Sequence, residues 1–184
     1  MDKIGFIGMG NMGGAILEGL LKIYAPERMV FTDVLKDKRE EVTEKTGVPH
    51  TATNRECAQQ AKFLILAVKP QYFTPVFEDI RQVLTQDQVI ISLAPGISIA
   101  TITERLGGNV RVVRVMPNTP ALLGEGMTGV SYDPAVYTAE EKAGIEAIFT
   151  SCGRIELVEE GLMDAVCCVS GSSPAYVYMF IEAL

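Results

Sequence analysis

The sequence predicts an α/β fold built on a doubly wound, mostly parallel sheet. Three observations lead to this prediction. Apolar segments of strand length alternate along the chain with segments of helical periodicity, which is the order of βαβ units. Some of these strands are apolar throughout, as in residues 63–68, which is typical of strands covered by helices on both faces. A glycine-rich turn, Gly8-x-Gly10-x-x-Gly13, follows the first strand and opens a helix, so the sheet is expected to be of the Rossmann type.

The elements are expected in alternating order. Strands are predicted at residues 4–7, 29–32, 63–68, 89–93, 110–116, 126–132 and 154–157. Helices are predicted at residues 11–24, 36–46, 73–84, 99–106 and 138–151. Gly47 ends the charged second helix, and the pair Gly107 and Gly108 ends the fourth. Thr138 and Glu141 form a capping-box pattern at the start of the fifth.

One further helix is expected after Gly161, where the composition becomes more apolar. Ser172 or Ser173 is its expected N-cap, and Pro174 is expected at its first helical position. Since this helix is apolar on almost every side, we expect other elements to bury it.

The chain is therefore expected to hold two units. Residues 1–160 form a dinucleotide-binding unit, and residues 161–184 form the beginning of a helical unit. Because the last helix reaches Leu184 without a cap, we expect the helical unit to be represented by its first helix only.

Composition excludes several classes of function. The net charge is −7, with 23 acidic against 16 basic residues, which argues against a nucleic-acid surface. No apolar run reaches the roughly 18 residues that a membrane span requires, and residues 2–7 do not resemble a signal peptide, so a cytoplasmic location without a membrane partner is expected. The four cysteines lack C-x-x-C spacing and His50 is the only histidine, so no metal site is expected.

The glycine-rich turn predicts a site for a dinucleotide. Gly8 permits the tight turn, Gly10 lets the backbone approach a pyrophosphate, and Gly13 lets the helix pack closely on the strand. The anion would lie against the N–H groups of Asn11 and Met12 at the helix N-terminus.

Asp33 closes the second strand, 20 residues beyond Gly13. At this distance an acidic residue accepts hydrogen bonds from the ribose hydroxyls of NAD and repels the 2′-phosphate of NADP. Lys36, Lys38 and Arg39 lie close enough that a rotated Asp33 would still admit NADP, so use of both cofactors is expected. The alternative is that Asp33 caps the following helix.

Three more strand ends are expected at the ligand-binding edge of the sheet. Lys69 follows one buried strand, and the small residues Ala94 and Gly96 follow the next and leave room for a nicotinamide ribose. Asn118 and Thr119 lie in a loop bounded by two prolines, where a substrate contact and a turn-only role are equally compatible with the pattern.

Taken in order, these segments resemble the pyrroline-5-carboxylate reductases. The matching motifs are Gly-Phe-Ile-Gly-x-Gly-Asn-Met at residues 5–12, Ala-Val-Lys-Pro at 67–70, Met-x-Asn-Thr-Pro at 116–120, Val-Glu-Glu at 158–160, Asp-Ala-Val at 164–166 and Ser-Gly-Ser-x-Pro-Ala-Tyr at 170–176. The resemblance covers residues 3–184. A threonine usual in the family is Cys167 here, and the second glycine of the last motif is Ser173.

The resemblance implies NAD(P)H-dependent reduction of 1-pyrroline-5-carboxylate to L-proline, the last step of proline biosynthesis, by a homodimer or higher homo-oligomer joined through an all-α dimerisation domain. It implies that substrate lies beside Glu160, and that the loop holding the substrate carboxylate belongs to a part of the helical domain beyond Leu184. The cofactor contacts that it implies, with NADP or NAD, are Ile7, Gly8, Met9, Gly10, Asn11, Met12, Asp33, Asn54, Ala67, Val68, Lys69, Pro70, Leu93, Ala94 and Pro95.

The implied reaction requires neither a nucleophile nor a metal, because reduction of an imine depends mainly on placing the hydride beside the carbon. Two alternatives remain open. A hydroxyacid dehydrogenase of the 3-hydroxyisobutyrate type shares the glycine-rich opening, but for its catalytic lysine this chain offers only Lys142, without a glycine-rich approach. The other alternative is a dinucleotide-binding protein without turnover.

Overall fold

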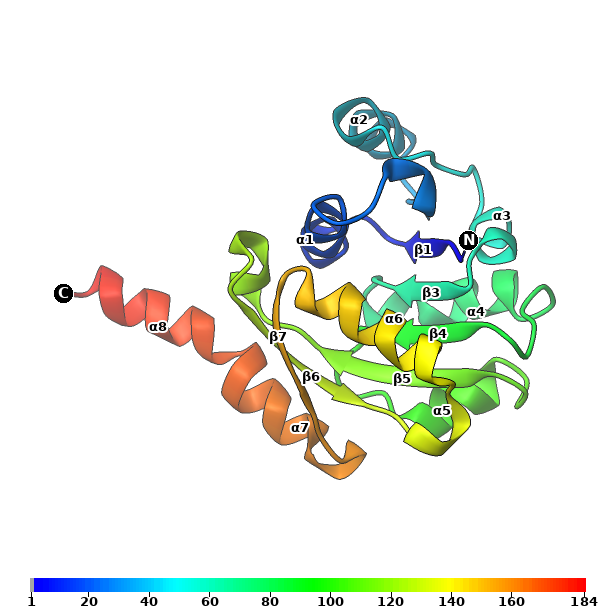
Figure 1. Cartoon of the computed structure of the whole chain (residues 1–184). Helices are drawn as coiled ribbons and strands as arrows, with labels where there is room; N and C mark the ends of the chain where they lie inside the picture. The colour runs from blue at the N-terminus through cyan, green and yellow to red at the C-terminus, as the bar shows by residue number, and fades with distance from the viewer. Residues whose placement is uncertain (1) are drawn as a thin grey trace.

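A seven-stranded sheet forms the centre of the structure, a computed structural model that describes residues 2–184 (Figure 1). The strand order is β2-β1-β3-β4-β5-β6-β7, and β6 is antiparallel to β5 while all other neighbours are parallel. The strands are β1 (Ile4–Ile7), β2 (Met29–Thr32), β3 (Phe63–Leu66), β4 (Val89–Ser92), β5 (Arg111–Met116), β6 (Gly126–Ser131) and β7 (Gly153–Leu157). The predicted doubly wound, mostly parallel sheet is confirmed.

Helices cover both faces of the sheet (Figure 1). They are α1 (Asn11–Leu20), α2 (Lys36–Thr46), α3 (Asn54–Gln60), α4 (Phe73–Ile80), α5 (Ile99–Arg105), α6 (Ala139–Thr150), α7 (Met163–Val166) and α8 (Ser173–Glu182). Alternate strand residues face opposite layers, so Phe6 packs with α1 and α6 whereas its neighbour Ile7 packs with α3, α4 and α5.

The helix boundaries follow the sequence with a few differences. Helix α2 has the predicted bounds, and Gly47 ends it in the left-handed conformation with a φ of 74°. The predicted helix over residues 11–24 ends at Leu20 and continues as a turn. Helix α3 was not expected; Thr53 caps it by accepting a hydrogen bond from the backbone N–H of Glu56.

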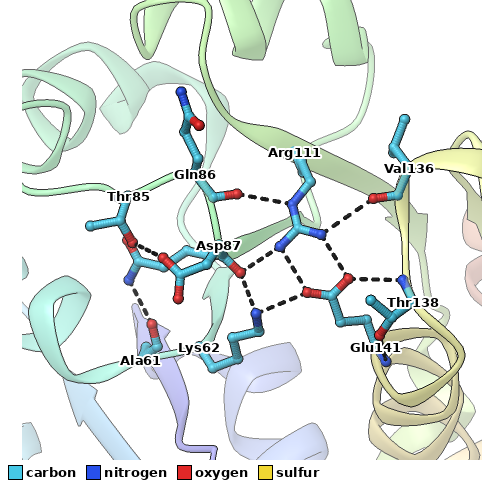
Figure 2. Close-up of polar contacts among 10 residues, drawn as sticks. Ala61, Lys62, Thr85, Gln86, Asp87, Arg111, Val136, Thr138 and Glu141 are labelled. Atoms are coloured by element: carbon cyan, nitrogen blue, oxygen red, sulfur yellow. Dashed lines mark hydrogen bonds and ion pairs between the residues drawn. The ribbon is translucent and has the colours of Figure 1, made fainter.

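An ion cluster joins α6 to the edge of the sheet where β3 and β5 begin, which we call the amino edge (Figure 2). The buried Glu141 carboxylate accepts from both terminal nitrogens of Arg111, at 2.7 and 2.8 Å, and pairs with Lys62 Nζ at 2.9 Å. Its Oε2 also accepts from the N–H of Thr138, whose hydroxyl accepts from the N–H of Glu141. The predicted capping box is thus present and is part of the cluster.

Residues 160–171 lie on the face of the sheet next to α5, over β5 and β6. Met163 is buried there, and Gly129 of β6 leaves room for Val166, because a Cβ atom at Gly129 would lie 2.7 Å from Val166 Cγ1. Residues 167–171 form a π-helical turn that leads into α8.

Helix α8 extends away from the sheet (Figure 1). Ser172 is its N-cap, and Pro174 occupies the second helical position where the first was expected. Val177, Phe180 and Ile181 are 50%, 67% and 61% exposed, so the expectation that other elements bury this helix is not met within residues 2–184. No helix in this part of the chain has the length and apolar character needed to cross a bilayer.

Candidate functional site

The glycine-rich turn connects β1 to α1, and the structure accounts for its three glycines in different ways. Gly8 has a φ of 96°, and a Cβ atom there would lie 2.9 Å from the carbonyl oxygen of Ala67. A Cβ atom at Gly13 would lie 2.6 Å from the carbonyl oxygen of Gly8. Gly10 is different: its φ is −75° and no atom lies within 4 Å of a Cβ atom built there. The fold therefore requires Gly8 and Gly13, whereas the open space at Gly10 is suited to the close approach of a ligand.

The N-terminus of α1 is suited to an anion. Gly10 is the N-cap and provides no side-chain hydrogen bond, and the first turn contains no acidic residue. The first N–H groups of a helix lack intrahelical partners and carry partial positive charge, so they attract a phosphate group. These properties fit the pyrophosphate of a dinucleotide.

Asp33 lies at the end of β2, and its carboxylate is held by two backbone N–H groups. Oδ2 accepts from Met9 at 2.8 Å and Oδ1 accepts from Leu35 at 3.0 Å. Arg39 Nη1 donates to the carbonyl oxygen of Asp33 at 2.5 Å. The alternative that Asp33 caps the next helix is wrong, because Leu35 is the N-cap of α2 and no side chain caps that helix. The carboxylate instead fixes the loop after β2 to the glycine-rich turn.

A cavity of about 830 Å³ opens between the carboxyl ends of β1, β2 and β3 and the helices α3 and α4. It brings together five of the predicted cofactor residues, namely Ile7, Gly8, Asp33, Asn54 and Val68. Asn54 Nδ2 donates to Asp79 Oδ2 at 2.8 Å on its wall. Arg55 and Tyr72 also line the cavity, although the sequence reasoning had not named them; Arg55 directly follows Asn54, but nothing in the sequence singles out Tyr72.

The next strand ends continue this edge of the sheet, which we call the carboxyl edge. Ile7, Leu66 and Ser92 are partners in the ladder, so the segments that follow β1, β3 and β4 emerge side by side. Two groups of predicted cofactor residues lie there, and in each group the exposure is mixed: Ala94 is buried, Ala67, Val68 and Leu93 are half-buried, and Lys69, Pro70 and Pro95 are exposed. The first is Ala67, Val68, Lys69 and Pro70, and the second is Leu93, Ala94 and Pro95.

The loop after β5 carries two of the substrate-side candidates. Thr119 is exposed and begins a short 3-10 turn. Asn118 is half-buried: its Oδ1 accepts from the N–H of Met127 at 2.9 Å, and its Nδ2 lies 3.2 Å from Ser170 Oγ. The structure thus adds Ser170 to this part of the edge, a contact across 52 residues that the sequence did not suggest.

Glu160, the third candidate, connects the last part of the chain to α5. Its Oε1 accepts from the N–H of Ile99 at 2.6 Å and lies 3.7 Å from Arg114 Nη1. Arg114, also not named from the sequence, is 5% exposed and donates to Asp164 Oδ1 at 2.8 Å. Glu160 therefore fixes the start of α5, directly after the loop that contains Ala94.

Residues 2–184 contain no group of three or more histidine, cysteine, aspartate or glutamate side chains placed to hold a metal ion. One cysteine that contacts β1 is unsuitable as a nucleophile. Cys57 is fully buried, which raises the pKa of its thiol to about 12, and its Sγ donates to the carbonyl oxygen of Phe6. It acts as a core residue.

Comparison with known proteins extends these observations. A family model described as "NADP oxidoreductase coenzyme F420-dependent" matches residues 3–96. The chain is 40% identical to the pyrroline-5-carboxylate reductase of Escherichia coli, over 99% of this chain and 68% of the relative. Among solved structures, the pyrroline-5-carboxylate reductase of Coxiella burnetii is 36% identical with a TM-score of 0.92, over 100% of this chain and 68% of that one. The Plasmodium falciparum pyrroline carboxylate reductase with NADP bound is 33% identical with a TM-score of 0.87, over 100% of this chain and 67% of that one.

Proposed function

The chain belongs to the pyrroline-5-carboxylate reductase family, and on this premise we propose that it reduces 1-pyrroline-5-carboxylate to L-proline with NADPH or NADH, the last step of proline biosynthesis. The reduced nicotinamide supplies the hydride. The observation that carries the proposal is the identity of 36–40% over nearly the whole chain to reductases of this name. This identity argues against the alternative of a hydroxyacid dehydrogenase.

We propose that the carboxyl edge holds the cofactor in three parts. The uncapped α1 and the open position at Gly10 would receive the pyrophosphate. The cavity beside Asp33 and Asn54 has the size and the polar groups to take the adenosine half. The segments after β3 and β4 would then lie beside the nicotinamide half, with Lys69 and Ala94 as the residues at its two sides.

The substrate side would lie next to these segments, at the end of β5. Asn118, Thr119 and Glu160 remain the candidates there. Their contribution would be to position the imine and to exclude water, because the reaction needs the hydride donor and the electrophilic carbon held close together.

We further propose the two-unit organisation, with a dinucleotide-binding unit at residues 1–160 and a helical unit that begins at 161–184. The exposed apolar side chains of α8, including Val177 and Phe180, support self-association through the second unit. The chain spans 68% of the length of the Escherichia coli reductase and of a second curated relative. A cytoplasmic location remains a prediction from the sequence.

The substitution Gly10→Val tests the cofactor site, because the protein itself leaves this position open. We expect the variant to keep its melting temperature and to lose at least about tenfold in NADH and NADPH affinity by calorimetry, equivalent to about 1.4 kcal/mol. Gly161→Val, at a second glycine with open space around it, is the matched control. Unchanged affinity in the Gly10 variant would refute the assignment of the turn.

Activity is tested by the consumption of NADPH or NADH with 1-pyrroline-5-carboxylate, and in reverse by proline-dependent reduction of the oxidised cofactor at high pH. Turnover in both directions is the expected result once the loop that the resemblance implies for the substrate carboxylate is present. Cofactor binding without turnover in either direction would favour the alternative of a dinucleotide-binding protein that is not catalytic.

A further inference from the structure

We propose that Asn118 is a positioning residue that turns the Ser170 hydroxyl into a hydrogen-bond donor for an oxygen of the bound reactants. The inference rests on the proposed function, because it assigns a role at the same carboxyl edge. Asn118 would then act through Ser170 instead of contacting substrate directly.

The orientation of the Asn118 amide follows from its partners. Its Oδ1 lies 2.9 Å from the backbone nitrogen of Met127, and its Nδ2 lies 3.2 Å from Ser170 Oγ. A backbone N–H only donates, so the amide oxygen must face Met127 and the amide NH₂ group must face Ser170. The contact with Met127 thereby fixes which end of the amide reaches the serine.

The polarity of the serine follows in turn. An NH₂ group only donates, so Ser170 Oγ accepts in this contact. A hydroxyl that accepts one hydrogen bond still holds its own proton, which is free to be donated to another acceptor. Ser170 is only half-buried, so a ligand at this edge has access to that proton.

The segment that carries Ser170 is held firmly against the sheet. Arg114 of β5, which is 5% exposed, donates to Asp164 Oδ1 of this segment at 2.8 Å. Gly129 allows Val166 to approach β6, and Gly171 lies over Met116, since a Cβ atom at Gly171 would lie 3.5 Å from the Met116 sulfur. These contacts place Ser170 beside the end of β5, one strand away from β4 and the loop that contains Ala94.

The group that accepts the hydrogen bond from Ser170 is, in this proposal, an sp² oxygen of a bound reactant. Two are present in the proposed reaction: the carboxamide oxygen of the nicotinamide and the carboxylate of the imine acid. Both would lie on the β5 side of the cofactor, and both would be favoured by a donor whose direction is set before binding.

Two substitutions test the proposal. Ser170→Ala removes the donor. Asn118→Asp is nearly isosteric and keeps the acceptor for Met127, but it faces Ser170 with a carboxylate oxygen, so the serine must donate to it and the proton is no longer available. Ser172→Ala, in the same segment, is the matched control for removal of a hydroxyl.

Calorimetry on the full chain measures three ligands: NADH, ADP-ribose, which lacks the nicotinamide, and L-proline added to the chain saturated with NAD⁺. Both variants are expected to weaken either NADH about three- to tenfold, the effect of one neutral hydrogen bond, or L-proline about ten- to hundredfold, the effect of one hydrogen bond to a charged group, with ADP-ribose unchanged. A loss with NADH identifies the carboxamide oxygen, and a loss with L-proline identifies the carboxylate.

Unchanged affinity for both NADH and L-proline in Ser170→Ala would overturn the proposal, as would an equal loss of ADP-ribose affinity or the same loss in Ser172→Ala. Failure of the wild-type chain to bind NADH and ADP-ribose would instead count against the proposed function. If Asn118→Asp lowers the melting temperature strongly, the affinities of Ser170→Ala for NADH and L-proline alone decide whether the proposal stands.

Discussion

Replacing Glu141 by glutamine should destabilise the fold at neutral pH and remove a pH-dependent part of its stability. The substitution keeps the size of the side chain and removes its charge. The Glu141 side chain is 7% exposed and pairs with Lys62 and Arg111, whose side chains are 21% and 23% exposed. Glutamine would leave these two cations at the amino edge without their anion, which is costly for groups that are mostly buried.

The pKa of Glu141 gives the size of the effect. Hydrogen bonds from Arg111, against the opposing effect of burial and with further help from Lys62 and the Thr138 N–H, lower this pKa from 4.5 to about 2. At about 1.4 kcal/mol for each pH unit, that difference corresponds to roughly 3 kcal/mol in favour of the charged, folded form. Because the glutamine amide oxygen would still accept one hydrogen bond from Arg111, we expect a loss of about 2–3 kcal/mol in the free energy of unfolding.

The sign of the pH dependence follows from the direction of the shift. A carboxyl group with a lowered pKa in the folded state binds fewer protons there than in the unfolded state, so its contribution is complete above pH 4.5. The contribution is lost as the pH falls from 4.5 towards 2, and about half of it remains near pH 3.3. The difference between wild type and Glu141→Gln should therefore shrink over this range.

Urea unfolding followed by circular dichroism at several pH values between 7 and 3 measures this difference. Glu146→Gln, which removes the same charge from the exposed side of α6, is the matched control and should change stability by less than about 0.5 kcal/mol. A difference below about 0.5 kcal/mol for Glu141→Gln at pH 7, or one that stays constant down to pH 3, would refute the reasoning.

Three further predictions concern single contacts. Asp33→Ser should raise the affinity for NADPH relative to NADH about tenfold, because it removes charge repulsion with the 2′-phosphate. An unchanged ratio in fluorescence titrations would mean that Asp33 only fixes the loop after β2 to the glycine-rich turn. Gly13→Ala should cost about 1–3 kcal/mol in thermal unfolding, since its Cβ atom would lie 2.6 Å from the carbonyl oxygen of Gly8; a melting temperature equal to that of wild type would show that α1 can shift. Thr138→Ala should cost about 1 kcal/mol by removing the acceptor for the Glu141 N–H, and Thr138→Ser should restore most of it.

The periodicity of the sequence was sufficient to predict the sheet and most helices, because each of these elements buries a continuous set of apolar side chains. The predicted strand over residues 63–68 ends at Leu66, since Ala67 and Val68 leave the sheet to form part of the candidate site. Helix α3 was missed because it buries only Cys57 and Ala58 and so shows no apolar periodicity, although the spacing of Thr53 and Glu56 is a capping pattern that would have indicated it. The antiparallel direction of β6 has no counterpart in the apolar pattern.

The candidate site was predictable where its residues are close in sequence. The glycine-rich turn is such a case, since strand, turn and helix follow one another directly along the chain. The contact of Asn118 with Ser170 depends on how residues 160–171 dock on β5 and β6, and a pairing between distant polar side chains leaves no periodic pattern. The order of the three glycines in the motif was enough to assign the close approach of a ligand to Gly10, and the structure adds that no atom lies within 4 Å of a Cβ atom built there.

The ion cluster lies at the amino edge of the sheet, and the glycine-rich turn lies at the opposite, carboxyl edge. Ala67 lies five residues after Lys62, at the other end of β3, a distance of about 16 Å at about 3.3 Å per residue. Substitutions farther apart than about 10 Å that share no partners usually have additive energetic effects. The double variant of Glu141→Gln and Gly10→Val should thus combine the stability loss of the first with the affinity loss of the second, each unchanged in size. An engineer seeking a more heat-resistant chain can therefore alter the amino edge while leaving cofactor affinity as it is.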